Sequence, residues 1–232
     1  MAVFSNLPAK EFEDARKWSQ YWLDPCKFMF GLCYTEDEVA AGSNEVAVVR
    51  LIPDLPHLRA MTKLWQEERL FVVVKSRRMI VSWSLTALEL YLAMTTPHSR
   101  IYVISTDQMK SDKLVERHQF IYKRLPEDMP KPHISTRAGV KGGISRIDFE
   151  ETDSSIEALP GDPDKMRQEG ATLIRMEEIA FWKPAARADL TYKAIMPTIM
   201  GGGRLVVVSS AQDGTFFKRL VFDELGTAVR RG

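Results

Sequence analysis

The chain has 232 residues, 45% of them apolar and 27% charged, and a formal net charge of +1 from 32 basic and 31 acidic residues. This composition is that of a globular protein with a sizeable core, in one large domain or two small ones, and it excludes an intrinsically disordered chain. Because the net charge is close to zero, any polyanionic partner must bind to a local basic patch.

Neither the cysteines nor the N-terminus indicates a metal site or a membrane segment. Cys26 and Cys33 are six residues apart with no histidine cluster nearby, which predicts two reduced, partly buried thiols. The first six residues lack the charged start and apolar run of a signal peptide. No apolar stretch approaches the roughly 20 residues needed to cross a bilayer. We therefore expect a soluble, cytoplasmic protein that does not contact membranes.

Residues 1–65 predict a helical and irregular segment that packs on the rest of the protein. A helix is expected at 11–21, with aromatic residues on one face, and a second at 57–66. Trp65 and Gln66, at the end of the second helix, either flank a bound adenine or belong to the core.

From residue 71 onward, strand patterns alternate with helix patterns. Strands are predicted at 71–74, 100–105, 144–149, 154–158, 171–176 and 204–210, and helices at 82–94, 107–125 and 216–225. This alternation predicts an α/β fold: a mostly parallel sheet with helices on both faces.

The loop after the first of these strands is the first candidate site. A helix N-terminus presents unpaired N–H groups and partial positive charge, so it attracts anions. Lys75, Arg77 and Arg78 add three cations to this loop. Ser82 is predicted to cap the following helix and to offer a hydroxyl to a phosphate-bound Mg²⁺. The loop therefore has the charge of a phosphate-binding loop.

The loop departs from the standard phosphate-loop pattern, G-x-x-x-x-G-K-[ST]. Only its final serine is matched, since Lys75, Ile80 and Val81 stand where the two glycines and the lysine are usual. Ile80 resists the positive φ that glycine adopts there. Taken alone, a solvated basic turn is the favoured interpretation.

Two later strands also end in polar side chains. Glu177 and Glu178 follow the strand at 171–176, where one acid would support a metal and the other would activate water. Adjacent residues on a strand point to opposite sides, so the two carboxylates are expected not to crowd each other. Ser209 and Ser210 end the strand at 204–210. Taken singly, each pair is more often the start of a solvated turn.

The three strand ends in this order are typical of ATPases with an additional catalytic glutamate, and the chain resembles one family of them. It is similar to the large terminase subunits of tailed bacteriophages over about residues 60–225. Residues 75–83 resemble the deviant Walker A motif of that family, 177–182 its Walker B motif and 201–211 its coupling motif. The segment 154–161 resembles the hairpin strand that precedes Walker B.

The resemblance implies a three-layer P-loop NTPase domain over residues 66–232 that binds ATP and Mg²⁺. It implies that Glu178 is the catalytic base and that Ser82 and Glu177 hold the metal. Ser209 and Ser210 would couple hydrolysis to motion, and Arg77 or Arg78 would sense the γ-phosphate. The implied nucleotide-binding loop is Lys75, Ser76, Arg77, Arg78, Met79, Ile80, Val81 and Ser82.

The resemblance also implies a motor that hydrolyses ATP to push double-stranded DNA into a procapsid. Its expected partners are the DNA, a portal protein, a small terminase subunit and copies of itself, in a ring on the procapsid, with a monomer in isolation. Its expected location is the host cytoplasm and, transiently, the portal vertex. Glu177 stands where aspartate is usual, and a nuclease domain is expected to be absent from this chain.

Some alternatives stay open. Arg137 and Arg146 are candidates for an arginine that acts on a neighbour's ATP, although solvent-exposed loop arginines are the favoured interpretation. The four histidines form no spaced cluster and are expected at the surface or at helix ends. A nucleotide- or DNA-binding module with impaired hydrolysis and a translocating ATPase of helicase type are the alternative functions.

Overall fold

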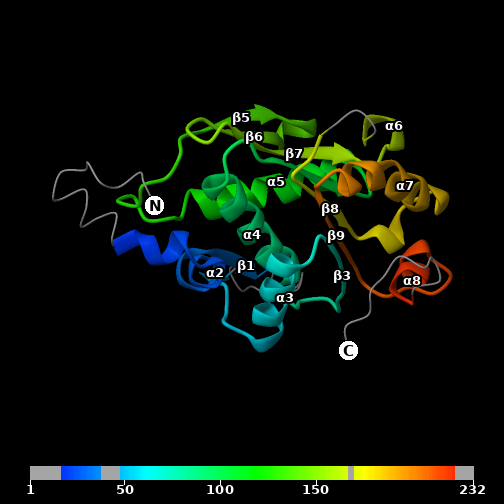
Figure 1. The fold of residues 1–232 in the computed structure, drawn as a ribbon, viewed down its shortest axis with the longest axis horizontal. Helices are drawn as coiled ribbons and strands as arrows, with labels where there is room; N and C mark the ends of the chain where they lie inside the picture. Colours follow the sequence, from blue (N-terminus) through cyan, green and yellow to red (C-terminus); the bar gives the residue numbers. More distant parts are fainter. Residues whose placement is uncertain (1–16, 38–47, 167–169, 223–232) are drawn as a thin grey trace.

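The computed structural model describes residues 17–37, 48–166 and 170–222, and its centre is a seven-stranded mixed sheet (Figure 1). The strand order is β3-β9-β8-β4-β7-β6-β5. The first five of these run parallel, and β6 and β5 complete the sheet as antiparallel strands. The strands are β3 (Leu70–Val74), β4 (Arg100–Ser105), β5 (Ile134–Ala138), β6 (Ile144–Phe149), β7 (Ser154–Pro160), β8 (Leu173–Glu177) and β9 (Arg204–Ser209). The predicted mostly parallel α/β sheet is confirmed.

Helices cover both faces of this sheet, giving three layers. On one face α4 (Val81–Thr95) and α5 (Gln108–Tyr122) share an apolar core with the sheet. On the other face α7 (Ala186–Met200) and α8 (Phe216–Val221) share a second core. The short helices α6 (Pro163–Met166), η1 (Val140–Gly142) and η2 (Ile179–Phe181) lie in the connections.

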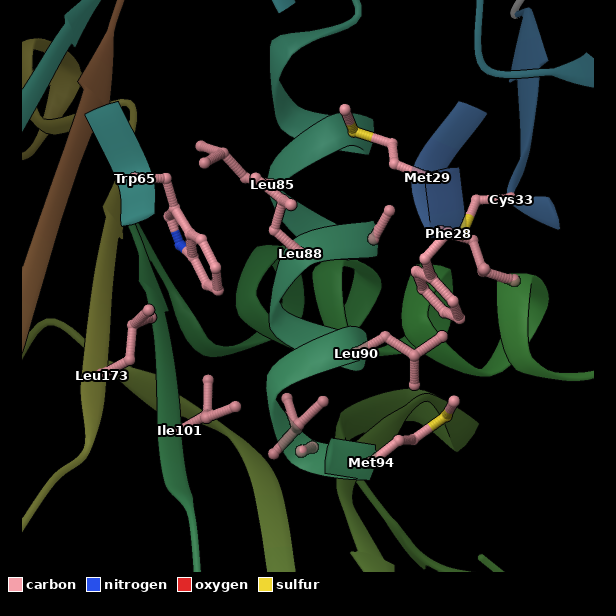
Figure 2. Packing of buried hydrophobic residues seen from close by; sticks show 14 of the residues in the cluster. Phe28, Met29, Cys33, Trp65, Leu85, Leu88, Leu90, Met94, Ile101 and Leu173 are labelled. Atoms are coloured by element: carbon pink, nitrogen blue, oxygen red, sulfur yellow. The ribbon is translucent and has the colours of Figure 1, made fainter. Parts of the chain in front are cut away.

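Helix α4 is largely buried between the sheet and the N-terminal helices. Figure 2 shows it with Leu85 and Leu88 toward Trp65 on one side and with Phe28 and Met29 on the other. Its sequence has apolar residues all round, as expected for a helix buried on every side. The helix that follows the cationic loop is therefore fixed rigidly in the core.

The N-terminal region is helical and irregular, as predicted, and also contains a strand pair; of the predicted helix at 11–21, residues 11–16 lie outside the described residues and 17–21 are helical. Its described part has a helical turn at 17–22, then α2 (Pro25–Leu32) and α3 (Pro56–Glu67), but also the antiparallel pair β1 (Tyr34–Asp37) and β2 (Val48–Leu51). The predicted helix at 57–66 is confirmed as α3. The strand pair β1–β2 is the part that was not predicted, because these strands pair with each other across a gap in sequence that no local pattern reveals.

One strand of the sheet, β5, and one helix that covers it, α7, were not predicted. Strand β5 has the sequence ISTRA and is largely exposed, so it lacks the apolar run of a buried strand. Helix α7 mixes polar and apolar residues and contains Pro197, which is unusual inside a helix. Of the predicted helix at 216–225, residues 223–225 lie outside the described residues.

The two cysteines differ in their exposure to solvent. Cys26 is partly buried, as predicted, whereas Cys33 is fully buried; both cysteines are free. Among the described residues, no helix is long and apolar enough to cross a membrane.

Candidate active site

The three polar strand ends lie side by side, because β3, β9 and β8 are neighbours in the sheet. Parallel strands bring their carboxyl ends to the same edge, where ligands of α/β sheets bind. Hydrogen bonds continue past the strands: Lys75 N donates to Ser209 O over 3.1 Å, and Glu178 N donates to Val208 O over 2.8 Å. The sheet thus sets the spacing of all three candidate segments.

The loop between β3 and α4 adopts the backbone conformation that glycine usually supplies. Ile80 has φ 59° and ψ 5°, and Arg78 has φ 63°. The left-handed region costs a non-glycine residue about 1–2 kcal/mol. Ile80 therefore adopts the conformation that its side chain disfavours. Its partly buried side chain packs against the apolar core beside α4, and we attribute the conformation to that packing.

The start of α4 also differs from the expectation. Ile80 is the N-cap residue and makes no side-chain capping hydrogen bond, so Ser82 lies inside the first turn and does not cap the helix. With no side chain capping it, this turn retains donors for an anion. On the outer side, His57 Nε2 of α3 lies 3.2 Å from Met79 O of the loop.

The two glutamates and Lys75 form one cluster. Lys75 Nζ lies 2.6 Å from Glu178 Oε1 and 3.8 Å from Glu177 Oε1. Glu177 Oε1 also accepts a hydrogen bond from Ser82 Oγ over 2.5 Å. The expectation that the two acids point apart is wrong, because β8 ends at Glu177 and Glu178 has φ 53°. This turn brings both carboxylates to the same ammonium group.

The serines of β9 contact the second glutamate. Ser209 Oγ lies 3.5 Å from Glu178 Oε2, and Ser210 N donates to the same oxygen over 3.4 Å. Ser209 Oγ also accepts from Ala180 N over 3.1 Å. The end of β9 is thus hydrogen-bonded to the residues just after β8. A shift of Glu178 would change its contacts with Ser209 and Ser210.

Trp182 holds the end of β8 in place. Its Nε1 donates to Glu177 O over 3.0 Å, and the ring is buried. Gly161, after β7, makes room for the ring, since a Cβ there would lie 2.4 Å from the indole. The aromatic residue of the Walker B-like motif therefore has a structural role beneath the acids.

The remaining loop residues face solvent. Ser76, Arg77, Arg78 and Met79 are exposed, and no carboxylate among the described residues lies within ion-pair distance of either arginine. Two cations without a protein counter-charge at a helix N-terminus favour an anion there.

Three other candidates lie away from this edge. Arg137 and Arg146 are on β5 and β6, at the opposite side of the sheet from β3. Arg146 pairs with Asp148 and Glu157 at 2.7 Å each. Trp65 is buried in the core near the amino end of β9, where its carbonyl accepts from Arg204 over 3.0 Å. Of its two interpretations, the core one is correct.

Behind the acids lies a group of buried charges that the sequence did not reveal as a group. Arg175, Glu89 and His118 are each fully buried, and they connect β8 with α4 and α5. Arg175 was recognisable as an unusual residue for a buried strand. The expectation that His118 lies at a surface or helix end is wrong, since α5 turns it onto Glu89.

The donor set at the strand ends suits ATP and Mg²⁺. Ser82 Oγ and Glu177 Oε1 are hard oxygen donors that already lie in contact, the type that Mg²⁺ accepts alongside phosphate oxygens. The described residues contain no group of three or more acidic, histidine or cysteine side chains for a metal, so a metal here would depend on additional ligands. A cavity of about 390 Å³ adjoins the ends of β3 and β9. Its lining includes Val74, Gln212, Phe217 and Lys218.

No protein-family model and no curated protein sequence matches this chain. Solved structures do. The large terminase of bacteriophage HK97 aligns with 89% of this chain and 41% of its own, at a TM-score of 0.65 and 10% identity. A variant of the large terminase ATPase domain of a Thermus phage aligns with 71% of this chain and 66% of its own, at a TM-score of 0.52 and 16% identity.

These similarities establish the fold. The chain has the three-layer α/β fold of large terminase ATPase domains, as the resemblance in sequence implied. It spans 41% of the HK97 protein and 66% of the Thermus phage domain.

Proposed function

We propose that this chain is the ATPase domain of a phage large terminase, which hydrolyses Mg-ATP to move double-stranded DNA. The observation that carries the proposal is the convergence of Lys75, Ser82, Glu177 and Glu178 within one set of contacts at the carboxyl edge of the sheet. Each has the chemistry that phosphoryl transfer requires: a cation for phosphate, oxygen donors for a metal and a carboxylate base.

Bound Mg²⁺ would neutralise charge on the phosphates, and Ser82 and Glu177 would hold it. Lys75 lies beside both acids and is the cation for the β- and γ-phosphates. The exposed Arg77 and Arg78 supply further positive charge, and either one senses the γ-phosphate. The N–H groups around Ile80, where no side chain competes for them, bind phosphate oxygens.

Glu178 is the general base that accepts a proton from the attacking water. Its Oε2 contacts Ser210 N and Ser209 Oγ, which orient the carboxylate. When Glu178 changes charge or position, these contacts change too. The end of β9 then shifts, and α8, which follows β9 in the chain, shifts with it. We propose that this is how hydrolysis couples to DNA movement.

The partners follow from the same proposal. Double-stranded DNA, a portal protein, a small terminase subunit and further copies in a ring are the partners expected of a packaging motor. Arg137 on the edge strand β5 and Arg146 on β6 lie on the side of the sheet opposite β3, so the ATP that either would act on is that of a neighbouring copy. In a ring, such an arginine raises phosphoryl-transfer rates by a large factor. The host cytoplasm and the portal vertex are the proposed locations.

The test of catalysis is Glu178→Gln, which keeps size and removes the base. We expect the steady-state ATPase rate to fall by about 10²–10⁴-fold while Mg-ATP binding persists. Glu150→Gln, at an exposed turn, is the matched control and should hydrolyse ATP like the wild type. Unchanged hydrolysis by Glu178→Gln would rule out the mechanism.

The alternative of a binding module with impaired hydrolysis is favoured by the missing glycines and by Glu177. Lys75→Ala tests whether the loop binds ATP, independently of hydrolysis, because it removes the cation proposed to contact the phosphates. We expect ATP affinity to fall at least tenfold, measured by titration calorimetry, with Lys63→Ala on α3 as the control. A wild type that binds ATP without turnover, with or without DNA, would favour the binding module.

A further inference from the structure

Arg175 lies two residues before Glu177 on β8, so both side chains are on the face covered by α4 and α5. The Arg175 side chain is fully buried and its Nε lies between two carboxylates. Nε is 3.3 Å from Glu89 Oε1 and 3.8 Å from Glu177 Oε2. Within the described residues these three atoms have no well-formed hydrogen bond, so the shared ion pair is their main contact.

The same guanidinium also contacts the first turn of α4. Arg175 Nη1 donates to Ser82 O over 3.2 Å and lies 3.4 Å from Thr86 Oγ1. Ser82 and Glu177 are the two residues whose oxygens meet over 2.5 Å at the strand ends. One buried side chain therefore touches the backbone of one of these residues and the carboxylate of the other.

The guanidinium is itself held from behind. His118 Nε2 of α5 lies 2.9 Å from Glu89 Oε2, and His118 Nδ1 lies 3.0 Å from Leu114 O. Burial lowers the pKa of His118, against the opposing effect of the Glu89 carboxylate. Glu89 and His118 are both fully buried. The chain of contacts thus runs from α5 through α4 to the acid at the end of β8.

The two oxygens of Glu177 have different surroundings. Oε1 faces Ser82 and Lys75, whereas Oε2 faces Arg175. Glutamate has one more rotatable bond than the aspartate usual at such a site, so more conformational entropy is lost when it is fixed. A cation behind Oε2 holds the carboxylate in the orientation that turns Oε1 to Ser82.

We propose that Arg175 is a positioning residue for magnesium binding, which holds the Glu177 carboxylate and the Ser82 turn in register, with Glu89 and His118 holding Arg175. The inference rests on the proposed function, because it concerns the metal pair of that site. Residues behind metal ligands typically change metal affinity by 10–100-fold when replaced.

A purely structural role for the buried charges makes a different prediction. Buried ion pairs are often replaced by apolar residues without loss of stability, and the adjacent Ile174 and Met176 show that apolar residues fit on the other face of this strand. A structural role therefore leaves the affinity for Mg²⁺ unchanged in any variant that still folds.

The experiment uses the double variant Glu89→Gln/Arg175→Met, which removes both partners so that no lone charge remains on α4. The measurement is binding of a fluorescent, non-hydrolysable ATP analogue as Mg²⁺ is titrated, with thermal melting as the check on folding. We expect the half-saturating Mg²⁺ concentration to rise about tenfold. Ile174→Val, on the opposite face of β8, is the control and should match the wild type.

The outcomes separate the two proposals. A folded double variant with the wild-type Mg²⁺ requirement overturns the positioning role and leaves the proposed function intact. A wild type that binds no Mg-nucleotide overturns the proposed function, and the inference with it. If the double variant does not fold, His118→Gln provides the second test, with an expected smaller rise in the Mg²⁺ requirement, and no rise there counts against the proposal.

Glu177→Asp tests the reason for the arrangement. The shorter acid draws back from Arg175, so replacing Arg175 in the aspartate background should change the Mg²⁺ requirement much less than in the wild type. Additive effects of the two replacements would show that Arg175 does not act through Glu177.

Discussion

The two faces of β8 differ in kind. Ile174 and Met176 point into an apolar core with α7 and α8. Arg175 and Glu177, one residue along, point to α4 and α5, where Glu89 and His118 are also buried. The same strand thus holds a hydrocarbon face and a charged one, and only the charged face reaches Lys75 and Ser82.

The apolar face of β8 serves stability, and the charged face serves the candidate site. The apolar face needs only volume and shape, so it tolerates conservative changes. The charged face is stable only while every charge keeps its partner, since an unpaired buried charge is costly. We infer that the strand is fixed by one face so that the other can present carboxylates in a defined position.

The largest effect is expected from breaking the charged face at one residue. Arg175→Met alone leaves Glu89 and Glu177 buried near each other without their shared cation. We expect a loss of about 3–5 kcal/mol in the free energy of unfolding, measured by urea denaturation. Ile174→Val on the apolar face should cost only about 0.5–1.5 kcal/mol. Equal losses at the two positions would remove the distinction between the faces.

A smaller change in stability is expected from altering the backbone conformation at the start of α4 than from removing a buried side chain of the same helix. Ile80→Gly relieves a left-handed conformation worth about 1–2 kcal/mol but gives up side-chain contacts and adds freedom to the unfolded chain. We expect a net change within about 1 kcal/mol, with nucleotide binding retained. Leu85→Ala, fully buried on the same helix, should cost about 2–5 kcal/mol by the same measurement.

The smallest effect concerns pH. Burial lowers the pKa of His118 in the folded state, so the unfolded chain binds its proton first as the pH falls below about 6.5. Stability from this residue is therefore present above the unfolded pKa and is lost as the pH falls toward the folded value. Melting between pH 7.5 and 5.5 should show a drop of a few degrees that His118→Gln reduces.

His133 gives the matched comparison, because its contact with Glu151 raises its pKa. Its contribution has the opposite sign: it is present below the unfolded pKa and is lost as the pH rises through the folded value. This pair is exposed, so His133→Gln should change melting very little. A wild-type melting temperature that does not change with pH would contradict the assignment for His118.

Much of the fold could be predicted, because buried strands and amphipathic helices leave periodic patterns. The strands at 71–74, 100–105 and 204–210 and the helix at 107–125 match observed elements within a few residues. The exposed β5 and the proline-containing α7 lack such patterns. The pairing of β1 with β2 depends on contacts between distant segments, which no local window contains.

The residues of the candidate site were predictable by type and only partly by arrangement. Lys75 and Glu177 come from motifs at strand ends and Ser82 from the first turn of α4; strand order brings the strand ends to one edge, and the packing of α4 brings Ser82 onto Glu177. Their roles in ATP hydrolysis stay predictions. The direction of Glu178 was not predictable, because its positive φ is set after the strand ends, by its neighbours.

The sequence by itself determined the buried strands of the sheet, which of them end in polar residues and that the loop at 75–82 lacks glycine. Only the tertiary structure decided what these features do to one another. Ile80 has a left-handed backbone conformation at the start of α4, a helix that is packed on several sides. Arg175, Glu89 and His118 form one buried group because β8, α4 and α5 meet there. The physical reason is that burial and charge pairing are properties of distances in space, and side chains such as Arg175 and Glu89, 86 residues apart, acquire a distance only when the chain folds.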